Sequence, residues 1–240
     1  MLSVDLYLLK PAFVDTRQLN ILPAELSPEE ASHWQGIRQP GRQREYLLGR
    51  VLLRRLLADR LGCPAADLQF FTQDHGKPAL LDQQWQFNLS HSGEWLVLAL
   101  CQQGPLGVDI EMGSRRRATL PLAERFYARS EYEWLLALPE EERDTAFYRL
   151  WSRKEAVLKA QGSGIAAGLD KVCFLPEEEW RLDNRLDDNA YQVQDWALDG
   201  GWLSLAAPTL QTRAYLLDAC LKSTSLNPML THTIFRESAS

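Results

Sequence analysis

The chain has 240 residues, of which 45% are hydrophobic and 24% are charged, and its formal net charge is −6. These values are typical of a globular protein with one large core or two smaller ones. Proteins that bind nucleic acids or membrane surfaces usually carry a basic excess, so the acidic balance argues against both classes.

The N-terminus and the cysteines indicate a cytoplasmic protein. The first ten residues, MLSVDLYLLK, have no basic segment before their apolar stretch, unlike a secretion signal. No apolar run approaches the ~20 residues that a membrane helix needs. The cysteines lie far apart in the chain and lack metal-ligand spacing; they are Cys63, Cys101, Cys173 and Cys220. We therefore expect free thiols in a reducing compartment.

A basic helix is predicted over residues 41–60, GRQREYLLGRVLLRRLLADR. Most of its arginines are expected to face solvent, and Arg42, Arg44 and Arg50 are candidates for binding an anion. The turn HGKPAL at 75–80 follows, in which Pro78 fixes the backbone after Lys77.

Polar residues precede an apolar strand in FNLSHSGEWLVLAL, residues 87–100. The residues expected at the entrance to this strand are Asn88, Ser90, His91 and Ser92, where hydroxyls, an imidazole and loop amides can surround phosphate oxygens. The alternative is structural: serines often satisfy their own turn, and a single histidine is usually a structural residue.

The segment PLGVDIEM, residues 105–112, alternates as a strand does. Asp109 and Glu111 therefore share one face, opposite Val108 and Ile110. Two neighbouring carboxylates repel unless they are solvated or share a cation, and oxygen ligands without histidine or cysteine favour Mg²⁺ or Mn²⁺ over Zn²⁺. A solvated strand face is the alternative interpretation.

Two further helices are predicted after this strand. In FYARSEYEWLLAL the pattern predicts a helix over 130–138, with Ser130 as its N-cap and Glu133 completing a capping box. Two interpretations fit the adjacent Glu131: a role in a functional site, or a favourable interaction of its negative charge with the helix N-terminus. In LWSRKEAVLKAQG, residues 150–162, Lys154 projects from an apolar helix face, which is costly unless its ammonium extends to solvent or meets an anion. Glu155 and Lys159 are neighbours on the edge of that face.

The chain contains a weak internal repeat. Four pairs of segments recur about 104 residues apart: VDLY and VDIE, YLLGRVLLR and LWSRKEAVL, DLQFF and DKVCF, and GEWLVLAL and GGWLSLAA. We predict an α+β protein of two similar halves, 1–105 and 106–221, related by a pseudo-twofold axis, with a loosely ordered tail at 222–240. The repeat places Arg50 opposite Lys154 and predicts a cleft between the halves that both line with basic groups.

Together, GKPAL, FNLSHSGEW, LGVDIE, FYARSEYE and WSRKEAVLKAQG resemble the Sfp-type 4′-phosphopantetheinyl transferases. The match runs from about Arg42 to Leu175, with Tyr127 in place of a phenylalanine. The resemblance implies two α+β halves in a monomer and transfer of phosphopantetheine from coenzyme A to a serine of an apo acyl or peptidyl carrier protein, a holo-acyl-carrier-protein synthase reaction. It does not distinguish carriers of fatty-acid, polyketide and nonribosomal-peptide synthesis.

The resemblance also implies roles for individual residues. Mg²⁺ would be held by Asp109, Glu111 and Glu155, and Glu155 or a water would act as base. The phosphates of coenzyme A would contact Lys77, next to Pro78, and also Ser90, His91, Lys154 and Lys159. The 3′-phosphate would lie near Arg42, Arg44 and Arg50. A carrier would dock near the loop 162–168 and Arg115, Arg116 and Arg117, although a solvated loop also explains that arginine run.

Two other functions fit part of the pattern. A Mg²⁺-dependent hydrolase of nucleotide pyrophosphates would keep the carboxylates and need no protein acceptor. A non-catalytic module that binds coenzyme A or a carrier would be expected to have lost Asp109, Glu155 or Lys159, all of which are present.

Overall fold

The fold was obtained as a computed structural model, which describes residues 3–226 apart from 82–83, 103, 114–117, 165–167, 176–179, 209–210 and 219. In these residues the α-helices are Thr16–Ile21 (α1), Pro28–Gly36 (α2), Pro40–Leu61 (α3), Thr119–Phe126 (α4), Arg129–Ala137 (α5) and Glu140–Gln161 (α6). The strands are Val4–Leu9 (β1), Phe70–Thr72 (β2), Pro78–Leu80 (β3), Gln86–Ser92 (β4), Trp95–Cys101 (β5), Gly107–Met112 (β6), Val172–Leu175 (β7), Arg181–Asn184 (β8), Gln192–Leu198 (β9), Gly201–Ala207 (β10), Thr212–Leu217 (β11) and Ser223–Leu226 (β12).

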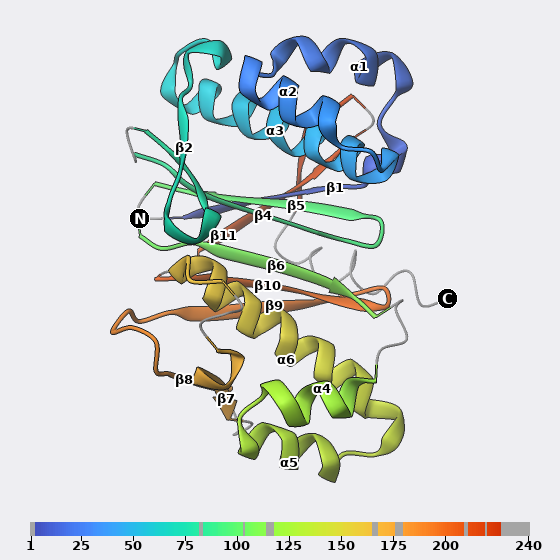
Figure 1. Cartoon of the computed structure of the whole chain (residues 1–240), viewed down its shortest axis with the longest axis vertical. Helices are drawn as coiled ribbons and strands as arrows, with labels where there is room; N and C mark the ends of the chain where they lie inside the picture. The colour runs from blue at the N-terminus through green and yellow to red at the C-terminus, as the bar shows by residue number, and fades with distance from the viewer. Residues whose placement is uncertain are drawn as a thin grey trace.

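Two main sheets form the centre of the molecule. The first has the strand order β12–β11–β1–β5–β4, and the second has the order β6–β10–β9. Only the β1–β11 pair is parallel within these two sheets; the other pairs are antiparallel. Figure 1 shows the resulting layers: α1–α3 on one outer side, the two sheets between, and α4–α6 on the other outer side.

The apolar pattern of the central strands explains this layering. In β5, Leu96 and Leu98 pack in the core beneath α3, whereas Val97 and Ala99 pack in the core between the sheets. A strand that is buried on both faces reads as a continuous apolar run, as WLVLAL does. The strand β6 is different, because only its Val108 and Ile110 face enters the core between the sheets.

The predicted α+β class and the two similar halves are confirmed. The strand order β1–β5–β4 recurs as β6–β10–β9, and each half has one helix of 22 residues, α3 or α6. Each long helix ends at a glycine in the left-handed region, Gly62 with φ 64° and Gly162 with φ 88°. Glycine adopts this conformation at little cost, so both helices stop at the equivalent place.

The C-terminal strands lie in the first sheet, which differs from the predicted division at residue 221. The strand β11 pairs with β1, and β12 pairs with β11. The side chains support this pairing, since Arg213 Nε donates to Asp5 Oδ1 at 2.6 Å and the rings of Tyr7 and Tyr215 stack at 4.8 Å. The chain after β10 therefore completes the N-terminal half, and part of the predicted tail is strand. The rest, 227–240, is outside the described residues.

The helix α5 begins at Arg129, so the predicted N-cap at Ser130 is wrong. The side chain of Glu131 accepts a hydrogen bond from the Ala128 N–H at 3.0 Å and caps the helix. Glu133 instead forms an exposed ion pair with Arg129. Glu131 and Glu133 each lie three positions after a possible N-cap, Ala128 for Glu131 and Ser130 for Glu133. In the structure Glu131 is the buried residue of the two, and it caps the helix.

Gly107 allows β6 to lie directly against α6. A Cβ atom at this position would collide with the carbonyl oxygen of Ala156 and the amide nitrogen of Ala160. These are backbone atoms, so no side-chain rotation relieves the collision. Close packing of a strand and a helix therefore requires glycine here.

Gly107→Ala is expected to lower the free energy of unfolding by about 3 kcal/mol and to reduce activity, because overpacking forces backbone shifts. β6 would move away from α6 and carry Asp109 with it. Thermal and urea unfolding measure the effect. The matched control is Gly36→Ala, whose Cβ would meet nothing within 4 Å. Equal stability of the two variants would contradict the argument.

Candidate active site

The two halves meet where β4 lies beside β6. These strands belong to different sheets, and side chains of β4 accept hydrogen bonds from the backbone of β6. The donors and acceptors are Val108 N to Asn88 Oδ1 at 2.9 Å, Ile110 N to Ser90 Oγ at 3.3 Å, and Met112 N to Ser92 Oγ at 3.1 Å. The polar residues expected at the entrance to a strand thus lie within β4, at every second position.

The same hydroxyl groups hold the two carboxylates of β6. Ser90 Oγ donates to Asp109 Oδ1 at 3.0 Å, and Ser92 Oγ donates to Glu111 Oε2 at 3.3 Å. Ser92 was expected either near a phosphate or in its own turn, and not as a partner of Glu111. The matching two-residue periods of S-H-S and D-I-E could have indicated this pairing.

Asp109 and Ser90, which are buried, and Lys159, which is partly exposed, form one group between β6, β4 and α6. Lys159 Nζ lies 2.6 Å from Asp109 Oδ1 and 2.9 Å from Ser90 Oγ. The Ser90 hydroxyl therefore donates once and accepts twice, from Lys159 and from Ile110 N, which uses its full capacity. Its predicted phosphate contact is not possible in this arrangement. Lys159 remains partly exposed, with 27% of its side chain accessible.

Glu155 lies one turn before Lys159 on α6 and completes the group. Burial, and then the negative charge of Asp109, raise the pKa of Glu155 to about 7, while Lys159 opposes this shift. Asp109 Oδ2 and Glu155 Oε1 are both buried and have no hydrogen-bond partner. Buried carboxylate oxygens of this kind need a proton or a cation.

These unpaired oxygens fit a divalent cation, because Mg²⁺ binds hard oxygen ligands and often uses only one or two carboxylates. The predicted third ligand, Glu111, is held by Ser92 and is not gathered with the other two. Among the described residues, no three His, Cys, Asp or Glu side chains form a group that could hold a metal ion. The pair Asp109 and Glu155 is therefore the part of the predicted metal site that the structure supports.

Lys154 is fully buried, and its anion is Glu131. Lys154 Nζ donates to Glu131 Oε2 at 2.6 Å and also to the carbonyl oxygens of Leu169 and Val172. Burial lowers the pKa of Lys154 and raises the pKa of Glu131, and their mutual attraction opposes both shifts. An ammonium has three N–H donors, and all three are used. The prediction that Lys154 contacts a diphosphate is therefore wrong.

The N-terminal half contains the same arrangement built on Arg54. Its Nε donates to Glu30 Oε2 at 2.7 Å, and its Nη1 donates to the carbonyl oxygens of Ala65 and Leu68. Like Glu131, Glu30 accepts the amide N–H just before its own helix. In each half, a cation of the long helix thus joins the preceding helix to the following turn. This duplication supports a structural role for Lys154.

Lys77 also has a structural position. Its Nζ donates to the carbonyl oxygens of Leu106, Lys159 and Ala160, at distances of 2.7–3.1 Å. It therefore joins the 74–77 turn of the first half to the C-terminal end of α6, where cations are favourable. Burial lowers the pKa of Lys77 to about 8. Because its three donors are occupied, the predicted phosphate contact of Lys77 is wrong for this structure.

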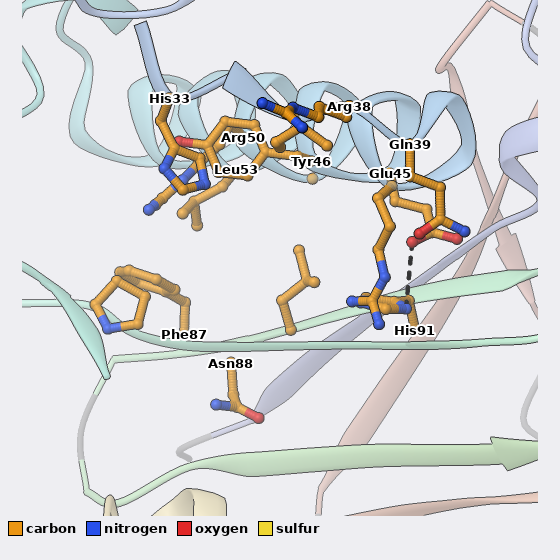
Figure 2. Close-up of a pocket in the computed structure, with 15 residues that line it drawn as sticks. His33, Arg38, Gln39, Glu45, Tyr46, Arg50, Leu53, Phe87, Asn88 and His91 are labelled. Atoms are coloured by element: carbon orange, nitrogen blue, oxygen red, sulfur yellow. Dashed lines mark hydrogen bonds and ion pairs between the residues drawn. The ribbon is translucent and has the colours of Figure 1, made fainter. Parts of the chain in front are cut away.

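A cavity of about 680 Å³ opens between α3 and the first sheet. Figure 2 shows Arg50 on the helical side of the cavity and Phe87 and His91 on the opposite side, whereas the Asn88 side chain points toward β6, away from the cavity. Of the predicted anion-binding residues, those that line it are Arg42, Arg50, Pro78 and His91. Arg44 does not line it, because its Nη2 turns to the carbonyl oxygen of Val14 at 3.4 Å.

The cavity and the carboxylate group lie on either side of β4. His91 faces the cavity, and its neighbour Ser90 contacts Asp109 and Lys159. The cavity that contains Arg50 is lined by residues 33–91 of the first half alone, so the prediction that both halves line it with basic groups is wrong. The predicted match of Arg50 with Lys154 is wrong as well, because the counterpart of Lys154 is Arg54, one turn after Arg50 on α3. The predicted carrier-docking segments, the loop 162–168 and Arg115–Arg117, include residues 165–167 and 115–117, which lie outside the described residues.

In the described part of the chain, none of the helices combines the length and the apolar character needed to cross a membrane.

Comparison with known proteins gives consistent matches over both halves. The family model of the 4′-phosphopantetheinyl transferase superfamily matches residues 105–207, and a model of the 4′-phosphopantetheinyl transferase N-terminal region matches residues 15–103. A putative 4′-phosphopantetheinyl transferase from Synechocystis sp. is 37% identical over 76% of this chain and 79% of its own length. The 4′-phosphopantetheinyl transferases Sfp of Bacillus subtilis and psf-1 of Bacillus pumilus are 34% and 38% identical, over 65% of this chain and 70% and 67% of their own lengths.

Proposed function

The chain belongs to the 4′-phosphopantetheinyl transferase superfamily, and we propose that it transfers the phosphopantetheine group of coenzyme A to a serine of an apo acyl or peptidyl carrier protein. The observation that carries this proposal is the meeting of Asp109, Glu155 and Lys159 beside β4. The other face of β4 lines a cavity whose volume is in the range of small-molecule sites.

In this proposal coenzyme A spans both sides of β4. Its nucleotide end occupies the cavity, where Arg42, Arg50 and His91 supply groups for a phosphate and Pro78 forms part of the wall. Its diphosphate lies near Lys159, whose partly exposed ammonium has a donor left after its bonds to Asp109 and Ser90. Because both halves of the fold are in one chain, we propose that the enzyme acts as a monomer.

Asp109 and Glu155 are the residues that we propose to hold Mg²⁺, with Glu111 close by on β6. A bound Mg²⁺ would neutralise charge on the diphosphate and favour displacement. This assignment is supported by the two unpaired buried oxygens and the raised pKa of Glu155.

In the proposed reaction, the serine oxygen attacks the phosphorus next to the pantetheine. A new O–P bond forms while the bond to the other phosphate breaks, and the departing oxygen keeps the electron pair of that bond. Adenosine 3′,5′-bisphosphate leaves. Glu155 is our candidate for the base that takes the serine proton, and Lys159 stabilises charge on the leaving phosphate. Asp109 holds Lys159 in place through their 2.6 Å contact.

Mass spectrometry of carrier proteins tests this function directly. The protein is mixed with coenzyme A, Mg²⁺ and a panel of apo acyl and peptidyl carriers. A mass gain of one phosphopantetheine on a carrier is expected, with loss of the gain after chelation by EDTA and recovery when Mg²⁺ is restored. Release of free phosphopantetheine with no modified carrier would indicate a hydrolase instead. Binding of coenzyme A without any product would indicate a non-catalytic module.

A further inference from the structure

Glu45 is an acidic residue in a cavity whose other charged side chains are arginines. It lines the cavity from α3, as do Arg42 and Arg50, and Arg38 lines it from the segment before α3. A carboxylate in such a place weakens the binding of any anion unless its charge serves another group. The group that Glu45 contacts is His91, and Figure 2 shows the two side chains joined across the cavity wall.

The contacts of His91 determine which ring nitrogen carries the proton. Nδ1 lies 3.4 Å from Glu45 Oε2, and Nε2 lies 3.3 Å from Arg42 Nη1. A carboxylate can only accept a hydrogen bond and a guanidinium can only donate one. The neutral ring therefore carries its proton on Nδ1 and presents the Nε2 lone pair to Arg42.

A phosphate group held by Arg42 would change this arrangement. Its oxygens accept hydrogen bonds, so His91 can bind them only if Nε2 also gains a proton. The doubly protonated ring is a cation, and the Glu45 carboxylate at Nδ1 would stabilise it, much as a carboxylate behind a histidine does in other sites.

We propose that Glu45 is a positioning residue, which orients His91 through Nδ1 and stabilises its cationic form when a phosphate of coenzyme A binds at Nε2. The inference rests on the proposed function, because coenzyme A supplies the phosphate. It adds the expectation that binding takes up a proton and that this uptake depends on Glu45.

The charges around His91 are consistent with a ring that is neutral before the ligand binds. Burial lowers its pKa below the usual 6.5, and Arg42 of α3 and Lys159 of α6 act in the same direction. Glu45 of α3 and Asp109 of β6 raise the pKa of His91. A phosphate adds negative charge at close range, so the ring is expected to gain a proton on binding. The affinity of the protein for coenzyme A should therefore rise as the pH falls from 8 to 6.5.

Calorimetric titration with coenzyme A, in the absence of a carrier, tests the inference. The wild type, Glu45→Gln and the control Glu94→Gln are compared at pH 6.5 and 8, in buffers with different ionisation enthalpies. Glu94 carries the same charge, is exposed, and pairs with Lys10 at 2.6 Å outside the cavity. Thermal unfolding of each variant establishes that it is folded.

We expect proton uptake by the wild type and by Glu94→Gln, and clearly less by Glu45→Gln. At pH 6.5 the dissociation constant of Glu45→Gln should be raised about tenfold, because a charge-assisted hydrogen bond is lost. In the transfer assay its effect should fall on KM for coenzyme A more than on kcat. Equal affinity and equal proton uptake in Glu45→Gln and Glu94→Gln would overturn the inference alone. Failure of the wild type to bind coenzyme A would instead overturn the proposed function.

Discussion

Replacing Asp109 with asparagine is expected to reduce the rate of carrier modification by roughly 10²–10³-fold. The substitution keeps the shape of the side chain and removes its charge. It would weaken the hold on Lys159, which now lies 2.6 Å from Asp109 Oδ1, and it would replace one of two unpaired carboxylate oxygens proposed to hold Mg²⁺. The measurement is the initial rate of phosphopantetheine transfer to a carrier at saturating coenzyme A.

The structure offers a matched control for this substitution. Asp199 lies in the exposed turn between β9 and β10, on the strand pair next to β6, so Asp199→Asn changes the same charge without touching the site. Its rate should stay within twofold of the wild type. Both variants should also unfold at nearly the wild-type temperature, because Lys159 retains Ser90 and solvent. Retention of more than a tenth of the wild-type rate by Asp109→Asn would remove Asp109 from the proposed machinery.

Lys154→Met is expected to destabilise the protein by about 3–5 kcal/mol, because it leaves the Glu131 charge buried without its partner. For a chain of this size, that corresponds to a fall of about 10 °C in Tm. The reason is the 0% exposure of both side chains, which prevents water from replacing the lost ammonium. Thermal unfolding followed by circular dichroism measures the shift.

A double variant separates the structural role of Lys154 from a role in binding coenzyme A. Lys154→Met/Glu131→Gln removes both charges of the buried pair. Its Tm should therefore lie well above that of Lys154→Met alone. If Lys154 instead served mainly to bind the diphosphate, Lys154→Met would leave Tm unchanged and raise KM for coenzyme A. The duplicated arrangement around Arg54 and Glu30 favours the first outcome.

The motif residues of α6 therefore divide between two sides of one helix. Lys154 points to α5 and the turn before β7, whereas Glu155 and Lys159 point toward β6. The segment W-x-x-K-E-x-x-x-K thus combines a buried structural residue, Lys154, with Glu155 and Lys159, the residues that we propose to take part in the reaction. Stabilising the helix through Lys154 also keeps the adjacent Glu155 in place.

Local geometry was readable from the sequence because it depends on residues that are close in the chain. The two-residue alternation placed Asp109 and Glu111 opposite Val108 and Ile110, and the structure has that arrangement. The repeat predicted the correspondence of β1 with β6 and of α3 with α6, but it placed the two helices one turn out of register, because the structure matches Lys154 with Arg54 and not with Arg50.

Only the tertiary structure decided which partner each charged group finds. The sequence showed that Lys154 needs an anion, but Glu131 and a diphosphate satisfy that need equally well until the distance between α5 and α6 is known. The same holds for Lys77, whose three acceptors lie on other elements, and for β11, which pairs with β1 more than 200 residues away. Periodicity specifies the face on which a side chain lies, whereas its partner depends on long-range packing, in which burial makes one satisfied arrangement far more stable than the others.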